Sequence, residues 1–151
     1  ITIVEDYRGG LPRIAVEPDK MTQAILNIIN NALEASSEGG TVKVKTDLIQ
    51  PPAEGGISEL GGPTDSNHGR VVIDIFNTGE RISVEDSERL FNPFFTTKPG
   101  GIGLGLSIAQ QIVTAHGGNI RVMNEEEGER KGVIFRIELP IAGTRVSPTS
   151  A

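Results

Sequence analysis

The segment RLFNPFFTTKPGGIGLGLS, residues 89–107, carries glycine at every second position from Gly101 to Gly105. Such alternation has the period of a strand, but glycine has no side chain to pack there and loses much backbone entropy. From Leu104 onward the apolar residues recur at helical spacing, so we expect a glycine-rich loop that leads directly into a helix. Backbone N–H groups and the positive end of the helix dipole would then point to one place, which favours a bound phosphate.

This loop matches neither of the two familiar phosphate-binding patterns. The P-loop pattern GxxxxGK[ST] occurs nowhere in the chain. The dinucleotide pattern GxGxxG fails because Leu106 stands at its last glycine, and because Pro99 and Gly100 precede it where a strand should be. An isolated GxGxG motif is equally compatible with a flexible loop before a helix. The rest of the chain is therefore needed to decide between a phosphate-binding loop and a merely flexible one.

The composition describes an acidic globular domain. The chain has 151 residues, of which 36% are hydrophobic and 23% charged, with a net charge of −6. This length suits one domain with a full core, and the negative charge disfavours a nucleic-acid surface. The absence of cysteine excludes disulfides and zinc–thiolate sites and is compatible with a reducing cytosol. No apolar run reaches membrane-spanning length and no signal peptide is visible.

The periodicity of the chain predicts an α+β fold. Strands are expected at residues 1–7, 13–16, 41–49, 70–76, 119–123 and 133–139. Helices are expected from a cap at Asp19 to a stop at Gly39, at 84–90, and at 104–115. Runs of adjacent strands favour a two-layer α/β sandwich, in which helices cover one face of a mixed, mostly antiparallel sheet.

Two segments are expected to lie outside the packed domain. Residues 50–69 are rich in proline, glycine, serine and acidic side chains, which predicts a long mobile insertion within a hairpin. Residues 142–151 form a polar tail with little left to pack. The domain itself is therefore expected to span residues 1–141. Because the chain opens on an apolar strand without methionine, we expect it to be a domain of a longer protein.

Polar side chains form a row on the first long helix. Asn27 and Asn31 are one helical turn apart, and Glu34 continues the row beside the apolar stripe. Asparagine is a poor helix former, so these residues together with Asn30 lower the helix propensity. Two interpretations remain open: the row is a solvated edge, or its amide oxygens bind Mg²⁺ together with phosphate oxygens. Mg²⁺ keeps several waters, so one asparagine carbonyl oxygen can suffice.

Several motifs resemble the GHKL family of ATP-binding proteins, and they follow one another in the family's order. They are LNIINNALEAS, within residues 25–37, for the N box; IDIFNTGERI, residues 73–82, for the G1 box; LFNPFFTTK, residues 90–98, for the F box; and GIGLGL, residues 101–106, for the G2 box of histidine kinases. The final strand GVIFRIELP resembles the closing strand of the same domain. The resemblance spans nearly the whole chain, and FNPFFTTK before a GLGL helix resembles sensor kinases of the nitrogen-regulation type.

The resemblance implies a Bergerat fold, with ATP and Mg²⁺ between the sheet and a flexible lid that comprises residues 91–105. It implies that Asn31 is the Mg²⁺ ligand and that Asn27 lies beside the phosphates or holds a metal-bound water. Lys98 would contact a phosphate, although a solvated loop lysine is also compatible with the sequence. Gly79 would let the backbone approach the adenine. The other residues implied at the nucleotide are Asn77, Ile82, Thr97, Gly101, Gly103, Leu104, Gly105 and Leu106.

The sequence departs from the family pattern at three positions. The G1 box usually reads DxGxG, but Asn77 replaces its aspartate and Arg81 its second glycine. Asn77 keeps a carbonyl oxygen that can accept from the adenine amino group, but without a charge the hydrogen bond is weaker. The G2 box has Ile102 where threonine is usual.

Three functions are compatible with these residues. The leading hypothesis is a histidine kinase catalytic domain, in which Asn27, Asn31 and Lys98 position Mg-ATP and neutralise its charge. A GHKL hydrolase is disfavoured, because such enzymes carry a water-activating glutamate where this chain has Asn27. A degenerate nucleotide sensor is the third possibility, motivated by the altered G1 box.

The kinase hypothesis also implies partners. Neither His68 nor His116 has the acidic neighbour and helical setting of a phosphoacceptor, so we expect both to be structural or surface residues. His116 lies at a helix end, where a cationic side chain suits the dipole. The phosphoacceptor is then expected on the protein's own dimerisation domain, outside this chain, and a response regulator is the next partner. The resemblance implies a cytoplasmic domain without direct membrane contact, within a full-length homodimer.

Overall fold

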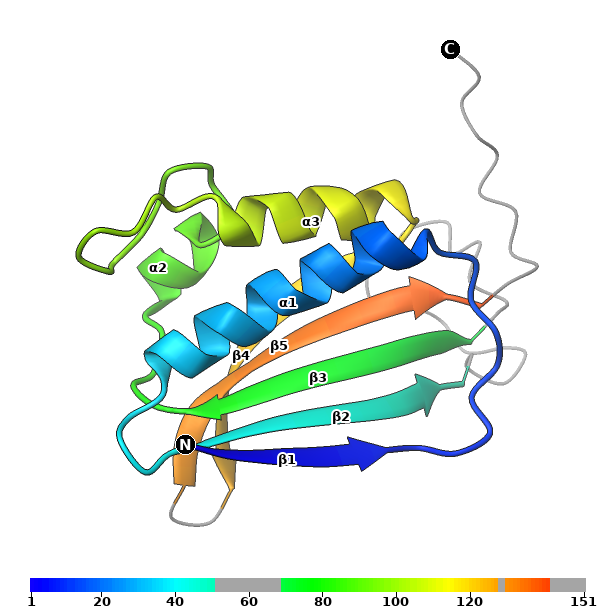
Figure 1. Cartoon of the computed structure of the whole chain (residues 1–151), viewed down its shortest axis with the longest axis horizontal. Coiled ribbons are helices and arrows are strands. Elements are labelled where there is room, and N and C mark those ends of the chain that lie inside the picture. Colours follow the sequence, from blue (N-terminus) through cyan, green and yellow to red (C-terminus); the bar gives the residue numbers. More distant parts are fainter. Residues whose placement is uncertain (51–68, 128–129, 142–151) are drawn as a thin grey trace.

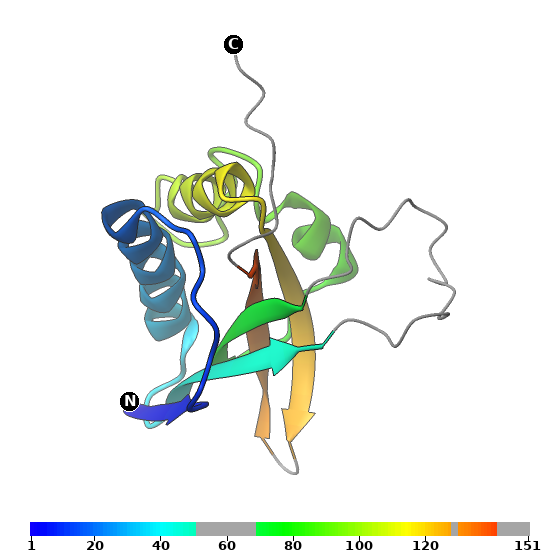
Figure 2. The same cartoon turned by 90° about the vertical axis from the view of Figure 1, so that its right-hand side faces the viewer.

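The computed structural model describes residues 1–50, 69–127 and 130–141. The predicted insertion and tail therefore lie almost entirely outside the described residues. The elements are β1 (Thr2–Tyr7), α1 (Pro18–Ala35), β2 (Thr41–Ile49), β3 (Arg70–Thr78), α2 (Val84–Arg89), α3 (Gly105–Ala115), β4 (Asn119–Glu127) and β5 (Arg130–Pro140). Both long helices, α1 and α3, lie on the same face of one sheet (Figures 1 and 2). The predicted α+β sandwich is confirmed.

The sheet is mixed and mostly antiparallel, as predicted. Its hydrogen-bonded order is β1-β2-β3-β5-β4. Only β1 runs parallel to its neighbour, β2, whereas β2–β3, β3–β5 and β4–β5 are antiparallel pairs. The central strand β3 ends beside the loop that leads to α2, so its last residues point to the end of the molecule where the lid lies (Figure 1).

The core fills the space between the helices and the sheet. Ala24, Ile28 and Ala32 of α1 are fully buried, and Ala109 and Val113 of α3 pack against them. The small side chains allow the two helices to approach closely, while larger side chains of β3 and β5 close the other side of the core. This packing leaves the polar row of α1 at the edge of the core, beside α3 and the loop before it.

The predicted strand at residues 13–16 is wrong. These residues form a loop that crosses from the edge strand β1 to the start of α1 (Figure 1). Ile14 and Val16 are partly buried against the core, so their alternation reflects packing of a loop and not strand pairing. Within the described residues the sheet has five strands, whereas the sequence predicted six.

The predicted ends of α1 also need correction. Its N-cap is Glu17, Pro18 occupies the first turn, and Asp19 lies inside the helix. Proline at the first helical position lacks only an N–H that has no intrahelical partner, and Asp19 still favours the positive end of the dipole. The helix ends at Ala35, before Gly39, and Ser36 caps it through its backbone N–H.

The last hairpin is longer than predicted. Its ladder continues through the charged residues that were expected to form a turn, with Glu126 opposite Lys131 and Glu127 opposite Arg130 in the register. Opposite charges across two strands favour pairing, which explains why polar residues extend this ladder. None of the helices in the described part of the chain combines the length and apolar character of a membrane span.

His116 joins the ends of the two long helices. Its Nε2 accepts a hydrogen bond from the Glu17 N–H at 3.0 Å, and its Nδ1 lies 2.7 Å from the Ile112 carbonyl oxygen. These two contacts confirm the expected structural role of His116. His68 lies outside the described residues.

Candidate functional site

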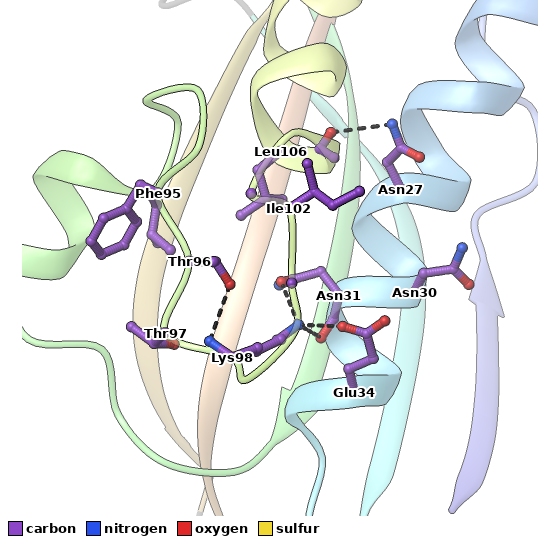
Figure 3. A pocket seen from close by; sticks show the side chains of 14 residues that line it. Asn27, Asn30, Asn31, Glu34, Phe95, Thr96, Thr97, Lys98, Ile102 and Leu106 are labelled. Atoms are coloured by element: carbon purple, nitrogen blue, oxygen red, sulfur yellow. Dashed lines mark hydrogen bonds and ion pairs between the residues drawn. The ribbon is translucent and has the colours of Figure 1, made fainter.

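A cavity of about 250 Å³ lies between α1 and the lid (Figure 3). Its walls come from the polar row of α1, the F box and the glycine-rich loop before α3. The lining residues are Asn27, Asn30, Asn31, Glu34, Leu90, Phe95, Thr96, Thr97, Lys98, Gly101, Ile102, Gly103, Gly105 and Leu106. The structure thus brings the predicted N-box and lid residues together, whereas Asn77, Gly79, Ile82 and Leu104 do not line this cavity.

Asn27 connects α1 to the start of α3. Its Nδ2 donates to the Gly105 carbonyl oxygen at 3.2 Å. Because a carbonyl can only accept, the amide orientation is fixed by this contact and its Oδ1 is left for another donor or a cation. An added Cβ at Gly105 would lie 3.9 Å from the Asn27 Cβ, an ordinary van der Waals contact, so packing against Asn27 does not require glycine there.

Lys98 reaches across the cavity to α1. Its Nζ lies 2.7 Å from Glu34 Oε2, 3.0 Å from Asn31 Oδ1 and 3.5 Å from the Asn31 carbonyl oxygen (Figure 3). Three acceptors around one ammonium make Lys98 more than a solvated loop residue. The contact with Glu34 is a finding that the sequence did not predict, because the two residues are 64 positions apart.

The glycine-rich loop folds back onto the F box. The Phe94 N–H donates to the Gly103 carbonyl oxygen at 2.9 Å. Gly103 has a φ of +75°, and an added Cβ would lie 2.6 Å from the Phe94 carbonyl carbon and the Phe95 oxygen. Glycine is therefore required there by both conformation and space. Phe95 is held in turn by the Arg89 guanidinium, 4.7 Å from its ring centroid.

The first turn of α3 points its N–H groups toward this loop. Leu104 is the N-cap, and no side chain caps the helix. The first N–H groups of a helix have no intrahelical acceptor, so they are free to bind an anion. Leu106 follows within this turn and lines the cavity.

The G1 residues occupy the end of β3, next to the C-terminus of α1. Asn77 is 1% exposed, and its Oδ1 has no hydrogen-bond partner among the described residues. A buried acceptor without a partner costs about 1–3 kcal/mol, which a donor from a ligand could offset. At Gly79 an added Cβ would lie 2.6 Å from the Ala35 carbonyl oxygen. Close packing against α1 therefore explains this glycine without reference to a ligand.

Two residues of β4 hold the segment after β3, and the sequence analysis missed both. Asn124 accepts from the Ile82 N–H and donates to the Ile82 carbonyl, both at 2.9 Å. Arg81, which replaces a family glycine, forms an ion pair of 2.7 Å with Glu126. The alternation of Ile120, Val122 and Asn124 could have placed Asn124 on the helix-covered face, but no local pattern signals its bond to Ile82.

The oxygens around the Lys98 ammonium also fit a hard cation. Among the described residues no three His, Cys, Asp or Glu side chains form a metal site. A Mg²⁺ ion at α1 would therefore depend on the Asn31 amide oxygen, supported by Glu34 and by oxygens of a ligand. Such oxygen donors are the ones that Mg²⁺ prefers, and it takes few of them from proteins.

Known proteins are similar to this chain in sequence. The family described as histidine kinase-, DNA gyrase B-, and HSP90-like ATPase matches residues 16–143. Sensor histidine kinase ZraS of Salmonella typhimurium is 36% identical over 131 residues, which cover 87% of this chain and 24% of ZraS. Sensory histidine kinase/phosphatase NtrB of Rhodobacter capsulatus is 32% identical over 146 residues, 93% of this chain and 37% of NtrB. The chain thus spans well under half the length of these relatives.

Solved structures agree with the sequence relatives. The nucleotide-free catalytic domain of histidine kinase ThkA is 30% identical with a TM-score of 0.70, and the match covers 92% of this chain and 78% of that one. ThkA is also known in complex with response regulator TrrA, at 29% identity and a TM-score of 0.66 over 91% of this chain and 33% of that one. Full-length ShkA in complex with AMPPNP is 27% identical with a TM-score of 0.68, over 92% of this chain and 25% of ShkA. The chain belongs to the family of histidine kinase-, DNA gyrase B- and HSP90-like ATPases, and within it to the catalytic domains of sensor histidine kinases.

Proposed function

We propose that this chain holds Mg-ATP and presents its γ-phosphoryl group to a histidine on the dimerisation domain of its own full-length protein, from which a response regulator receives it. The observation that carries the proposal is the convergence of Asn27, Asn31, Lys98 and the uncapped start of α3 on one cavity. An amide row, an ammonium and free N–H groups together suit a polyphosphate with its cation.

Each residue would have a separate task in this reaction. The Asn31 Oδ1 would hold the cation, and the first N–H groups of α3 would bind phosphate oxygens. The Lys98 ammonium would leave Glu34 and neutralise phosphate charge. Mg²⁺, when bound, would stabilise the charge that develops on the transferred group. Asn27 has no basic group to activate water, so positioning for transfer is favoured over hydrolysis.

A labelling experiment tests this function. The isolated chain should bind ATP in the presence of Mg²⁺ but should acquire no label from γ-³²P-ATP, because it lacks a phosphoacceptor. Mixed with its own dimerisation domain, it should label that domain on histidine, as an acid-labile and base-stable product. Stable self-labelling of the isolated chain at His68 or His116 would contradict the proposal, because the phosphoacceptor is expected on the dimerisation domain. Binding without transfer would support the nucleotide-sensor hypothesis.

Asn77 should determine how well the domain discriminates between bases. An amide presents both a donor and an acceptor, whereas a carboxylate only accepts and repels the guanine carbonyl oxygen. We expect modest ATP affinity and a small preference for ATP over GTP. Asn77→Asp should strengthen ATP binding by about 1 kcal/mol, the difference between charged and neutral hydrogen bonds, and widen the preference.

A competition titration of ATP against GTP on both proteins measures this effect. Thermal unfolding without nucleotide is the control, because a buried carboxylate at this position should also lower stability. Equal discrimination by both proteins would mean that Asn77 does not contact the base and that the G1 box is misaligned.

A further inference from the structure

The Lys98 ammonium occupies the oxygen that would bind Mg²⁺. Its Nζ is 3.0 Å from the Asn31 Oδ1 and 2.7 Å from the Glu34 Oε2. An ammonium and a divalent cation bind the same kind of oxygen donor and repel each other, so they compete for this amide oxygen. The structure therefore places the ammonium of Lys98, a residue of the lid, where the sequence predicts Mg²⁺.

We propose that Glu34 is a positioning residue that holds Lys98 on Asn31 in the nucleotide-free domain, and that binding of Mg-ATP exchanges the two cations. Mg²⁺ then takes the Asn31 Oδ1, and Lys98 moves to the phosphates. This inference rests on the proposed function, since it assigns a role to Glu34 at the same site.

Charge explains why Glu34 is needed. The Asn31 amide is neutral, and a neutral oxygen alone competes poorly with water for an ammonium. The carboxylate of Glu34 supplies the charge-assisted hydrogen bond, which is the shortest of the three. The Glu34 side chain is 63% exposed and that of Lys98 33%. Exposed ion pairs of this kind are weak, so the contact can be reversed by a ligand.

The position of the lid depends on this contact. Within the described residues, Lys98 makes every hydrogen bond that joins residues 96–102 to α1. Lys98 itself lies in a tight turn, where its N–H donates to Thr96 Oγ1 and its carbonyl accepts from the Gly101 N–H. Loss of the Nζ contacts would therefore leave the turn held only by its own hydrogen bonds, so that it opens more often.

Hydrogen exchange of the nucleotide-free chain tests the first half of the proposal. Glu34→Gln keeps the shape of the side chain but removes its charge. Amides of residues 96–103 should then exchange about two- to fivefold faster, the range that one exposed ion pair supports. The matched control is Glu38→Gln, because Glu38 is exposed in the loop after α1 and forms no ion pair among the described residues. Equal exchange in the Glu34 and Glu38 variants would overturn the proposal.

Calorimetry tests the exchange of cations. In EDTA, Glu34→Gln should bind ATP several-fold more tightly than the unmodified chain, because Lys98 is then free to meet the phosphates. Removal of a negative charge alone also favours ATP, so the same substitution is compared in a Lys98→Met background. The gain should be at least about twofold larger with Lys98 present. Equal gains in both backgrounds would mean that simple repulsion explains the effect and would overturn the role of Glu34.

Hydrogen exchange and calorimetry together also distinguish a failure of this inference from a failure of the proposed function. If the unmodified chain binds no ATP with Mg²⁺, the proposed function and the cation exchange fail together. The hydrogen-exchange measurement uses no nucleotide, so it still decides whether Glu34 holds Lys98 and the lid on α1.

Discussion

Replacing Asn31 with alanine is expected to slow phosphoryl transfer to the dimerisation domain about 100-fold or more, the scale on which loss of one preorganised electrostatic contact acts. The substitution removes the Oδ1 that would hold Mg²⁺, whereas the core neighbours Ile28 and Ala32 stay in place. The fold should therefore persist. Initial rates of histidine labelling at saturating Mg-ATP, with circular dichroism of the variant, measure both effects.

Asn30→Ala is the matched control for this prediction. Asn30 lines the edge of the cavity, but its amide points away from Lys98 (Figure 3) and lacks hydrogen bonds within the described part of the chain, so its loss should change the rate little. Asn27→Ala should have an intermediate effect, because its amide joins α1 to Gly105. Transfer at the unmodified rate by Asn31→Ala would show that the metal assignment is wrong.

Replacing Phe135 with alanine should have the largest effect on stability. Phe135 is 1% exposed on β5, and its ring meets that of Phe91 edge to face, with centroids 6.4 Å apart. Truncation leaves a cavity and should lower the free energy of unfolding by about 3–5 kcal/mol. This is a large share of the 5–15 kcal/mol that is usual for a domain of this size. Urea unfolding followed by circular dichroism measures the change.

Phe94→Ala provides the comparison with the same chemical change. The Phe94 side chain is 72% exposed, so its removal should cost less than about 1 kcal/mol. Because Phe91 belongs to the F box, Phe135→Ala should also weaken nucleotide binding. Equal losses of unfolding free energy in the two variants would contradict the prediction that the buried ring of Phe135 stabilises the fold.

The helices with a strong hydrophobic periodicity were predictable, and so was the placement of the polar residues beside their apolar faces. The apolar stripe of α1 fixed which side of the helix faces the core, which placed Asn27, Asn31 and Glu34 at its edge. The helix after the glycines followed from the change of period at Leu104. Both signals are local, because each depends on residues within a few turns of one another.

The incorrect and missing predictions share a different cause. Ile14 and Val16 alternate because a loop packs against the core, and a short sequence pattern cannot distinguish this from a strand. The β4–β5 ladder runs through charged residues because their partners across the hairpin favour pairing. The Asn124–Ile82 and Glu34–Lys98 contacts join residues far apart in the chain, and only the three-dimensional arrangement reveals them.

The hydrogen bond between Phe94 and Gly103 has a consequence for how the lid could vary in length. It closes a small loop whose tip, at Gly100, is exposed and has open space around it. Doubling the length of a flexible loop costs only about 0.6 kcal/mol in closure entropy. Insertions near Gly100 would therefore be tolerated, provided that residue 103, which packs against the backbone of Phe94 and Phe95, remains a glycine. The reach of the lid can thus change independently of the sheet and of the helix that follows.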